Sequence, residues 1–351
     1  MRNRDITLDV LRGLGILLVV FAHTNTTALS TVIYSFHMPL FFVISGCALT
    51  YSSQVQSVGI RRYVRSLAIP YLVFSLISFV YWAGIEWKFR PSDLAPIYSG
   101  SLGLLDVRIQ EFLNIFTAYS VNGAFEYNIV MWFLPCLFCS MVVYKWLKLH
   151  TGQWLSLCVI GLTALYFLTE DYMPVLPWCL EIAFVALPFV WVGDKCYAWV
   201  RNNNHWGLII ISLIIIIGGL LFTNHRVDMR THGFTNWWIF YPIALSFIYL
   251  LIKLSGVVVQ YERGVLQWMG RNSLIIMCLH EPIKRVTLKL FSIFMGWDIA
   301  EIRDSLLLSI VVVVFIILII LPLTNIINRY LPVVIGKPIK KNDNISLHSS
   351  L

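Results

Sequence analysis

Long apolar segments constrain the fold of this chain more than any other feature of its sequence. A helix needs about 20 apolar residues to cross the hydrocarbon core of a bilayer, and "SLLLSIVVVVFIILIILPLTNIIN" exceeds that length without a single charge. Charged residues make up only 13% of the chain, against roughly 25% in a soluble domain. A soluble fold of this length could not bury so much apolar surface, so the sequence predicts an integral membrane protein.

The hydropathy pattern predicts an all-α polytopic protein with about ten transmembrane helices in one bundle. We expect one transmembrane domain over residues 1–330 and a basic, disordered cytoplasmic tail over residues 331–351. Between two spans, "VRIQEFLNIFTAY" has the pattern of an amphipathic helix lying at the membrane interface. The ten expected spans are residues 8–29, 31–50, 67–87, 128–147, 154–169, 175–194, 206–222, 237–254, 271–291 and 305–327.

The distribution of Lys and Arg predicts the orientation of these spans, because both residues concentrate in cytoplasmic loops. With the N-terminus in the cytoplasm, sixteen of the 26 Lys and Arg residues fall inside, nine fall outside, and Arg12 lies within the first span. We therefore expect both termini in the cytoplasm. The same rule accounts for the net charge of +8, so we expect no nucleic-acid partner. The sequence leaves the oligomeric state open.

The cysteines and the absence of familiar motifs exclude several kinds of site. All seven cysteines fall in apolar stretches, and the Cys136–Cys139 spacing has no partner pair, so we expect packing roles. The sequence contains no G-x-S-x-G nucleophile motif and no cluster of metal ligands. We therefore expect no bound metal.

The first span, "DVLRGLGILLVVFAH", carries three ionisable side chains. Each costs roughly 2.5–3.5 kcal/mol inside a membrane, which makes it a functional candidate. Asp9 lies one helical turn before Arg12 and can pair with it. Arg12 and His23 are eleven residues apart, which returns them to nearly the same helix face at about 100° per residue. The alternative is an interfacial ion pair and a histidine with a structural role. The glycines of "RGLG" predict close helix packing.

The second span begins "IYSFHMPLFFVISG" and places His37 at the same outer end as His23. Pro39 predicts a distorted helix there, because proline cannot donate the backbone hydrogen bond. Ser45 and Gly46 predict close packing against another helix.

Three arginines, Arg61, Arg62 and Arg65, precede the third span on the expected cytoplasmic side. Arg62 and Arg65 share a face if this segment is an α-helix. Guanidinium groups bind phosphate with two parallel hydrogen bonds, so the cluster could form an anion site. A basic loop also follows from the positive-inside rule alone, and both interpretations stay open.

The later spans contain further polar candidates. Glu181 lies in the otherwise apolar "LPWCLEIAFVALPFVWVG". "MGRNSLIIMCLHEPI" places Arg271 at the start of the ninth span, with His280 and Glu281 deeper in it. Trp132, in "NIVMWFLPCLF", has no ionisable neighbour, which favours packing.

Taken together, six stretches in this order resemble membrane acyltransferase family three, especially its fucose 4-O-acetylase-like branch. The Arg12-to-His23 spacing and the Arg62-x-x-Arg65 pair match the family's two most characteristic motifs. The stretches span residues 8 to about 285 and are "LDVLRGLGILLVVFAH", "YSFHMPLFFVISG", "RRYVRSLAIPYLVFS", "WFLPCLF", "LPWCLEIAFVALPFVWVG" and "GRNSLIIMCLHEPI".

This resemblance implies an O-acyltransferase of the bacterial inner membrane. It would move an acyl group, usually acetyl, from cytoplasmic acyl-CoA to a sugar hydroxyl of a surface polysaccharide or its lipid-linked precursor. Acetyl-CoA would be a substrate, and no cofactor would be bound permanently.

The resemblance also implies roles for the candidate residues. His23 would be the general base or would position the acyl carbonyl, and Arg12 would stabilise negative charge. The arginines Arg61, Arg62 and Arg65 would hold the phosphates of coenzyme A. Asp9 and Glu181 complete the expected catalytic set. The residues expected to contact substrate or to support the catalytic groups are His37, Trp132, Arg271, His280 and Glu281.

Two other functions remain compatible with the pattern. A transporter or flippase for a sugar or a lipid-linked glycan would also have about ten spans and buried polar residues. A structural membrane subunit would not need Arg12 and His23 on one helix face. Chemical transfer of an acetyl group from acetyl-CoA distinguishes the enzyme from both.

Overall fold

The computed structural model describes residues 5–50, 59–89, 106–120, 124–222, 227–231, 236–261 and 264–337. These residues form helices and no strand, so the all-α prediction is confirmed for this part of the chain. The longer helices are α1 (Ile6–Thr24), α3 (His37–Thr50), α5 (Ile69–Gly84), α7 (Phe133–His150), α8 (Leu155–Thr169), α9 (Leu180–Asn202), α10 (Trp206–Phe222), α11 (Trp237–Val258), α13 (Ser273–Met295) and α15 (Leu306–Tyr330). The shorter ones are α2 (Ala28–Tyr34), α4 (Ile60–Tyr63), α6 (Val107–Thr117), α12 (Val265–Arg271) and α14 (Ile299–Asp304).

All ten predicted spans coincide with helical segments. Within the described ranges, seven segments are long and apolar enough to cross a membrane, which makes this a multi-pass membrane protein. Of the other three, α10 has only 17 residues, whereas α9 and α13 carry several charges. The count of about ten spans therefore stays a prediction. The seven segments are Ile6–Thr24, Ala28–Leu49, Ile60–Lys88, Ile129–His150, Gly152–Thr169, Trp237–Val258 and Leu306–Tyr330.

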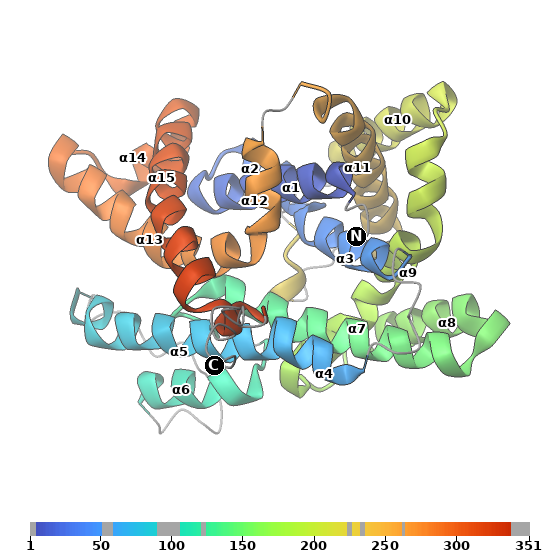
Figure 1. Ribbon diagram of the computed structural model, residues 1–351, viewed down its shortest axis with the longest axis horizontal. Helices are drawn as coiled ribbons and strands as arrows, with labels where there is room; N and C mark the ends of the chain where they lie inside the picture. The colour runs from blue at the N-terminus through green and yellow to red at the C-terminus, as the bar shows by residue number, and fades with distance from the viewer. Residues whose placement is uncertain are drawn as a thin grey trace, which may run out of the picture.

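Helix α1 lies at the centre of the molecule. Figure 1 shows α5, α7 and α8 along one edge, α13 and α15 at the upper left, and α10 and α11 at the upper right, with α1 and α12 between them. α1 packs against α2 and α3, which follow it in the chain, and against α11, α12, α13 and α15 from the C-terminal third. Side chains of α1 therefore meet residues from both ends of the sequence.

The backbones of α1 and α12 touch where two glycines face each other. A Cβ atom on Gly13 would lie 2.0 Å from the carbonyl oxygen of Leu266, and one on Gly270 would lie 1.8 Å from that of Asp9. Only glycine permits such an approach, as in other close helix crossings in membranes. The packing role predicted for Gly13 is confirmed.

Helices α3 and α9 make the same kind of contact through Gly46 and Gly193. Their Cβ atoms would lie 2.1 Å from the carbonyl oxygen of Val190 and 2.0 Å from that of Val43, respectively. The close packing predicted at Gly46 is confirmed. These two crossings fix α1 and α3, the helices that carry His23 and His37.

We expect Gly193→Ala to lower the melting temperature and the yield of folded protein, because its methyl group meets backbone that cannot move aside. Overpacking of a core commonly costs about 1–3 kcal/mol. Gly218→Ala in α10 is the matched control, since a Cβ there has no neighbour within 4 Å. Thermal unfolding and size-exclusion chromatography in detergent measure both variants. Equal melting temperatures for the two would contradict the packing described here.

The second span is broken into two helices just before His37. The backbone N–H groups of Ser35 and Phe36 donate to the carbonyls of Val32 and Ile33, at 3.1 and 3.2 Å, in short-range turns. Pro39 has no N–H to donate to the carbonyl of Ser35, so the helix restarts at His37. The distortion predicted at Pro39 thus lies one turn earlier and places His37 at the start of α3.

Helix α6 is amphipathic, as predicted, with its polar side turned inward. Gln110, Glu111 and Asn114 are buried against the protein, whereas Phe112 and Phe116 are exposed. Apolar side chains on the outside suit contact with lipid, which is the expected location of this helix.

The predicted disordered tail begins too early. Residues Pro332–Ile335 form a short 3₁₀-helix after α15, and Ile335 is buried. A Cβ on Gly336 would lie 2.4 Å from the carbonyl oxygen of Arg65, so this turn packs against the third span. Apolar residues in "LPVVIG" provide this anchoring. Residues 338–351 of the predicted tail lie outside the described residues.

Candidate active site

Three histidines from distant parts of the sequence meet at the C-terminal end of α1. The ring centroids of His23 and His37 are 6.1 Å apart, and those of His23 and His280 are 5.3 Å apart. Tyr34 joins the group, with its ring centroid 4.6 Å from that of His37 and 5.5 Å from that of His23. The structure therefore brings together the three predicted histidines, although the sequence separates the first and the last by more than 250 residues.

The hydrogen bonds of these rings fix their tautomers. Nδ1 lies near a backbone carbonyl in each case: Val19 for His23 at 2.9 Å, Ile33 for His37 at 3.0 Å, and Met277 for His280 at 2.8 Å. A carbonyl only accepts, so Nδ1 carries the proton and donates. In the neutral ring Nε2 is then the unprotonated nitrogen, which can act as a base.

A small cavity of about 50 Å³ opens beside His23 and His37. That volume holds no more than a few water molecules. Trp132 also lines the cavity, so this residue, for which packing was favoured, contributes to the site. Asp228 and Arg230, from the connection between α10 and α11, also line the cavity.

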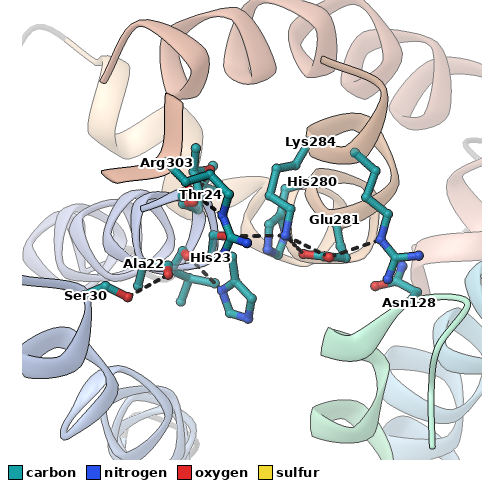
Figure 2. A network of polar contacts seen from close by, with 12 residues as sticks. Ala22, His23, Thr24, Ser30, Asn128, His280, Glu281, Lys284 and Arg303 are labelled. Atoms are coloured by element: carbon teal, nitrogen blue, oxygen red, sulfur yellow. Dashed lines mark hydrogen bonds and ion pairs between the residues drawn. The ribbon is translucent and has the colours of Figure 1, made fainter. Parts of the chain in front are cut away.

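A buried network of charged side chains on α13 contacts the backbone of His23. Lys284 donates from Nζ to both carboxylate oxygens of Glu281, at 2.7 and 2.8 Å, and to the backbone carbonyl of His23 at 3.2 Å. Arg285 donates to Glu281 at 3.2 Å and to Glu86 at 2.9 Å. Figure 2 shows how this network ties α13 to the last turn of α1. Glu281 thus acts through Lys284 on the backbone of His23.

The loop after α1 is also fixed by side chains from the C-terminal helices. Asn25 donates to the carbonyl of Arg303 and to the hydroxyl of Ser309, both at 3.0 Å. Arg303 in turn donates to the carbonyl of Thr24 at 3.2 Å. The bond from Arg303 to Thr24 fixes the residue after His23, and Figure 2 shows Arg303 and Lys284 both reaching this end of α1.

A second cavity, of about 170 Å³, lies nearer the N-terminal end of α1 and brings Arg12 and Arg62 together. Ser45 of α3 lines it as well, whereas Phe41, one turn earlier in α3, lines the His23 cavity. Both cavities therefore lie along the seam between α1 and α3. This agrees with the prediction that Arg12 and His23 share one face of the first helix.

Arg62 and Arg65, which were expected to share one face of an α-helix, lie in different helical segments, Arg62 in α4 and Arg65 in the following π-helix. Residues Val64–Ala68 form a π-helix, so the α-helical spacing assumed for this pair does not hold. All three arginines are exposed, but Arg61 and Arg65 are not among the residues that line the Arg12 cavity. Of the three arginines, Arg62 is the one placed to act with Arg12.

Asp9 is buried between two arginines. Its carboxylate oxygens lie 3.5 Å from Arg12 and 3.3 Å from Arg271, so the predicted Asp9–Arg12 pair is present. Arg271 belongs to this ion-pair group at the N-terminal end of α1. The structure therefore places it away from the His23 cavity, whose lining does not include it.

Glu181 is buried, but it holds loops together and does not face His23. Its carboxylate accepts from the hydroxyl of Ser120 at 2.6 Å and from the backbone N–H of Leu176 at 3.0 Å. It is not among the residues lining the His23 cavity. The structure thus separates Glu181 from the catalytic set expected from the sequence. Glu281 is the carboxylate that stands close to the histidines.

Several contributors to the site were not recognised in the sequence, among them Lys284, Tyr34 and Arg230. The orientation predicted from the sequence includes Lys284 among the nine outer Lys and Arg residues. Its position three residues after Glu281 in an apolar span is typical of a helical ion pair. Tyr34 and Arg230 carry no such local signal. They reach the site through tertiary packing. Within the described segments, no group of three His, Cys, Asp or Glu side chains, the three histidines included, has an arrangement that could hold a metal ion. The absence of a bound metal stays a prediction.

Comparison with known proteins finds one matching family model and a curated relative. The family model described as an acyltransferase domain matches residues 5–328. Among curated proteins, the nodulation protein NolL of Mesorhizobium japonicum is 28% identical over 225 residues. That match covers 56% of this chain and 52% of NolL, so the chain spans about half the length of this relative. No solved structure matches the chain.

Proposed function

The chain belongs to the acyltransferase family, and from this premise we propose that it is a membrane O-acyltransferase acting on a sugar. It transfers an acetyl or other acyl group from cytoplasmic acyl-CoA to a hydroxyl of a surface polysaccharide or of its lipid-linked precursor. Acyl-CoA is a substrate in this reaction, and no permanently bound cofactor is required.

The observation that carries the proposal is the state of His23. Its Nδ1 is held by the carbonyl of Val19, and its ring lines a cavity. A neutral imidazole with a free Nε2 can accept the proton of a hydroxyl near neutral pH. Lys284 and Arg303 fix the backbone around His23 from two sides, as a preorganised base requires.

The reaction then has two steps. The acceptor oxygen attacks the thioester carbonyl carbon while His23 Nε2 takes the hydroxyl proton, and a tetrahedral intermediate with a negative oxygen forms. The carbonyl re-forms as the carbon–sulfur bond breaks, and the thiolate of coenzyme A takes the proton from His23. Ester and free coenzyme A are the products, and His23 returns to its neutral state.

The Arg12 cavity suits the phosphate-bearing end of acyl-CoA. Arg12 and Arg62 line it together, and guanidinium groups bind phosphate oxygens through charge-assisted hydrogen bonds. This cavity and the His23 cavity both border α1 and α3. An extended donor lying along the seam would present its thioester near His23.

Incubation of the purified protein with labelled acetyl-CoA and candidate glycans tests the function. We expect label to appear in an alkali-labile ester on the glycan. A protein that moves the glycan across vesicle membranes without modifying it would contradict the proposal and would favour the transporter.

We expect Arg62→Ala to weaken binding of acetyl-CoA by roughly 10- to 100-fold, the worth of one or two charge-assisted hydrogen bonds. Arg62→Lys should recover part of the affinity, because it keeps the charge and loses the planar fork. Arg65→Ala should change affinity less, since Arg65 does not line the cavity. Titration calorimetry in detergent measures all three. An affinity for acetyl-CoA in Arg62→Ala equal to that of the parent would show that these arginines reflect only the positive-inside rule.

We also propose a bacterial inner-membrane location with about ten spans and both termini in the cytoplasm. The bias of Lys and Arg supports this orientation. In a cysteine-free background, Gln153→Cys should react with a membrane-impermeant maleimide only from the cytoplasmic side, and Arg108→Cys only from the outside. The opposite pattern would invert the orientation.

A further inference from the structure

The segment between α10 and α11 places an arginine in the wall of the His23 cavity. Met229–Thr231 form a short 3₁₀-helix, and the carboxylate of Asp228 accepts from the backbone N–H of Arg230 at 3.0 Å. Met229 is 3% exposed and Arg230 is 9% exposed. This segment is therefore packed into the protein, and Arg230 points its polar group into the interior.

The guanidinium of Arg230 has an unused donor. Its Nη1 atom is buried and has no hydrogen-bond partner in the described part of the chain. A buried cationic donor without a partner is costly. A ligand in the cavity that accepts a hydrogen bond from Nη1 would remove this cost. Such a ligand must present a negative or strongly polarised oxygen.

The other groups around the cavity do not supply this charge. In their neutral state His23 and His37 donate from Nδ1 to backbone carbonyls, so their Nε2 atoms carry lone pairs and cannot donate. Arg230 is the one Arg or Lys among the cavity-lining residues that the structure describes. The described lining thus contains two neutral bases, His23 and His37, one cation, Arg230, and the carboxylate of Asp228, which accepts from the backbone N–H of Arg230.

We propose that Arg230 binds the carbonyl oxygen of the acyl group and stabilises the negative charge that this oxygen gains in the tetrahedral intermediate. This inference rests on the proposed acyl transfer. When the acceptor hydroxyl attacks, one electron pair of the carbonyl moves onto its oxygen, beside Nη1 of Arg230, and the proton moves to Nε2 of His23. A donor already in place for this oxyanion lowers the barrier without any reorganisation.

The test compares Arg230→Gln and Arg230→Lys with the parent enzyme. Loss of one oxyanion donor commonly lowers kcat by roughly 10²–10³-fold, so we expect this loss in Arg230→Gln, with the KM for acetyl-CoA within about twofold of the parent. Arg230→Lys should recover part of kcat. Arg108→Gln is the control, because Arg108 pairs with Asp106 on the surface, and it should keep parent kcat.

A binding measurement separates this role from a structural one. Acetate carries a carboxylate of the size of the acyl group, and we expect it to raise the Tm of the parent in a concentration-dependent way that chloride does not reproduce. Arg230→Gln should keep its basal Tm and lose the acetate effect. Unchanged kcat together with an unchanged acetate effect in Arg230→Gln would overturn the proposal. A raised KM for the glycan at parent kcat would also overturn it, in favour of acceptor recognition.

Failure of the proposed function has a different signature. The parent protein could transfer no acetyl group to any glycan while acetate still raises its Tm through Arg230. That result would support an anion site at Arg230 and would contradict the proposed acyltransferase activity. If the parent is active and Arg230→Gln equals it in kcat and in acetate response, the activity stands and the role of Arg230 falls.

Discussion

Replacement of His23 by alanine or by glutamine is expected to abolish acyl transfer while the protein still inserts and still binds acetyl-CoA. A positioned general base supplies roughly 10²–10⁴-fold of a rate, and His23 is held for that role by Val19 and Lys284. Glutamine keeps a hydrogen-bonding side chain of similar reach but cannot accept the proton of the acceptor hydroxyl. Both variants should therefore show no acyl transfer although each is present in the membrane in the same amount as the parent protein.

The matched control is His150→Gln. His150 ends α7 and makes the same kind of bond, from Nδ1 to the carbonyl of Trp146 at 2.8 Å, but it is exposed and far along the chain from the cavity. We expect parent activity in this variant. Near-normal turnover in His23→Gln, at a protein level equal to that of the parent, would contradict the role of His23 as the general base. His37 and His280 would then be the bases to test.

The second large effect concerns the Glu281–Lys284 pair. We expect Glu281→Ala to prevent accumulation of folded protein, because it leaves the ammonium of Lys284 buried without its carboxylate. Breaking one partner of a buried pair commonly costs about 3–5 kcal/mol. The remaining partner of Lys284, the carbonyl of His23, is uncharged.

A double variant separates the stabilising role of this pair from a role in catalysis. Glu281→Gln with Lys284→Met removes both charges and keeps side-chain volume, a change that is often neutral or stabilising for a buried pair. We expect it to restore the yield lost in Glu281→Ala, as measured by fluorescence-detected size-exclusion chromatography. Its kcat should stay below that of the parent, because the backbone carbonyl of His23 loses its anchor. A double variant as unstable as Glu281→Ala would show that the ion pair is not the source of the effect.

The helices and part of the site could be predicted from the sequence because their signals are local. The lengths of the apolar stretches predict all ten helical segments. Pro39 predicts the break after which α3 begins at His37. Ionisable residues in apolar spans, above all His23 and Arg12, stand out because lipid penalises them. The sequence also places Arg12 and His23 on one face of α1, along the seam with α3.

The remaining features depend on tertiary packing, which no local pattern encodes. Glu181 and Glu281 look alike in sequence, each a carboxylate in an apolar span, yet the first accepts from Ser120 and the second faces the histidines. In the sequence Arg230 is one more charge of an outer loop, whereas in the structure it lines the same cavity as His23. The π-helix at Val64–Ala68 separates Arg62 from Arg65 without any signal in the residue types.

The contact of Asp9 with Arg271 joins residues that are 262 positions apart, and this has a consequence for biogenesis. A ribosome adds about 5–20 residues per second, so Arg271 is synthesised roughly 13–52 s after Asp9. During that time the first helix must reside in the bilayer without α12 and α13, and Arg12, three residues away, is the nearest charge that can neutralise Asp9. The histidine cluster closes only when the ninth span has been inserted. A chain arrested before that point contains His23 and His37 but lacks His280, so its site is incomplete.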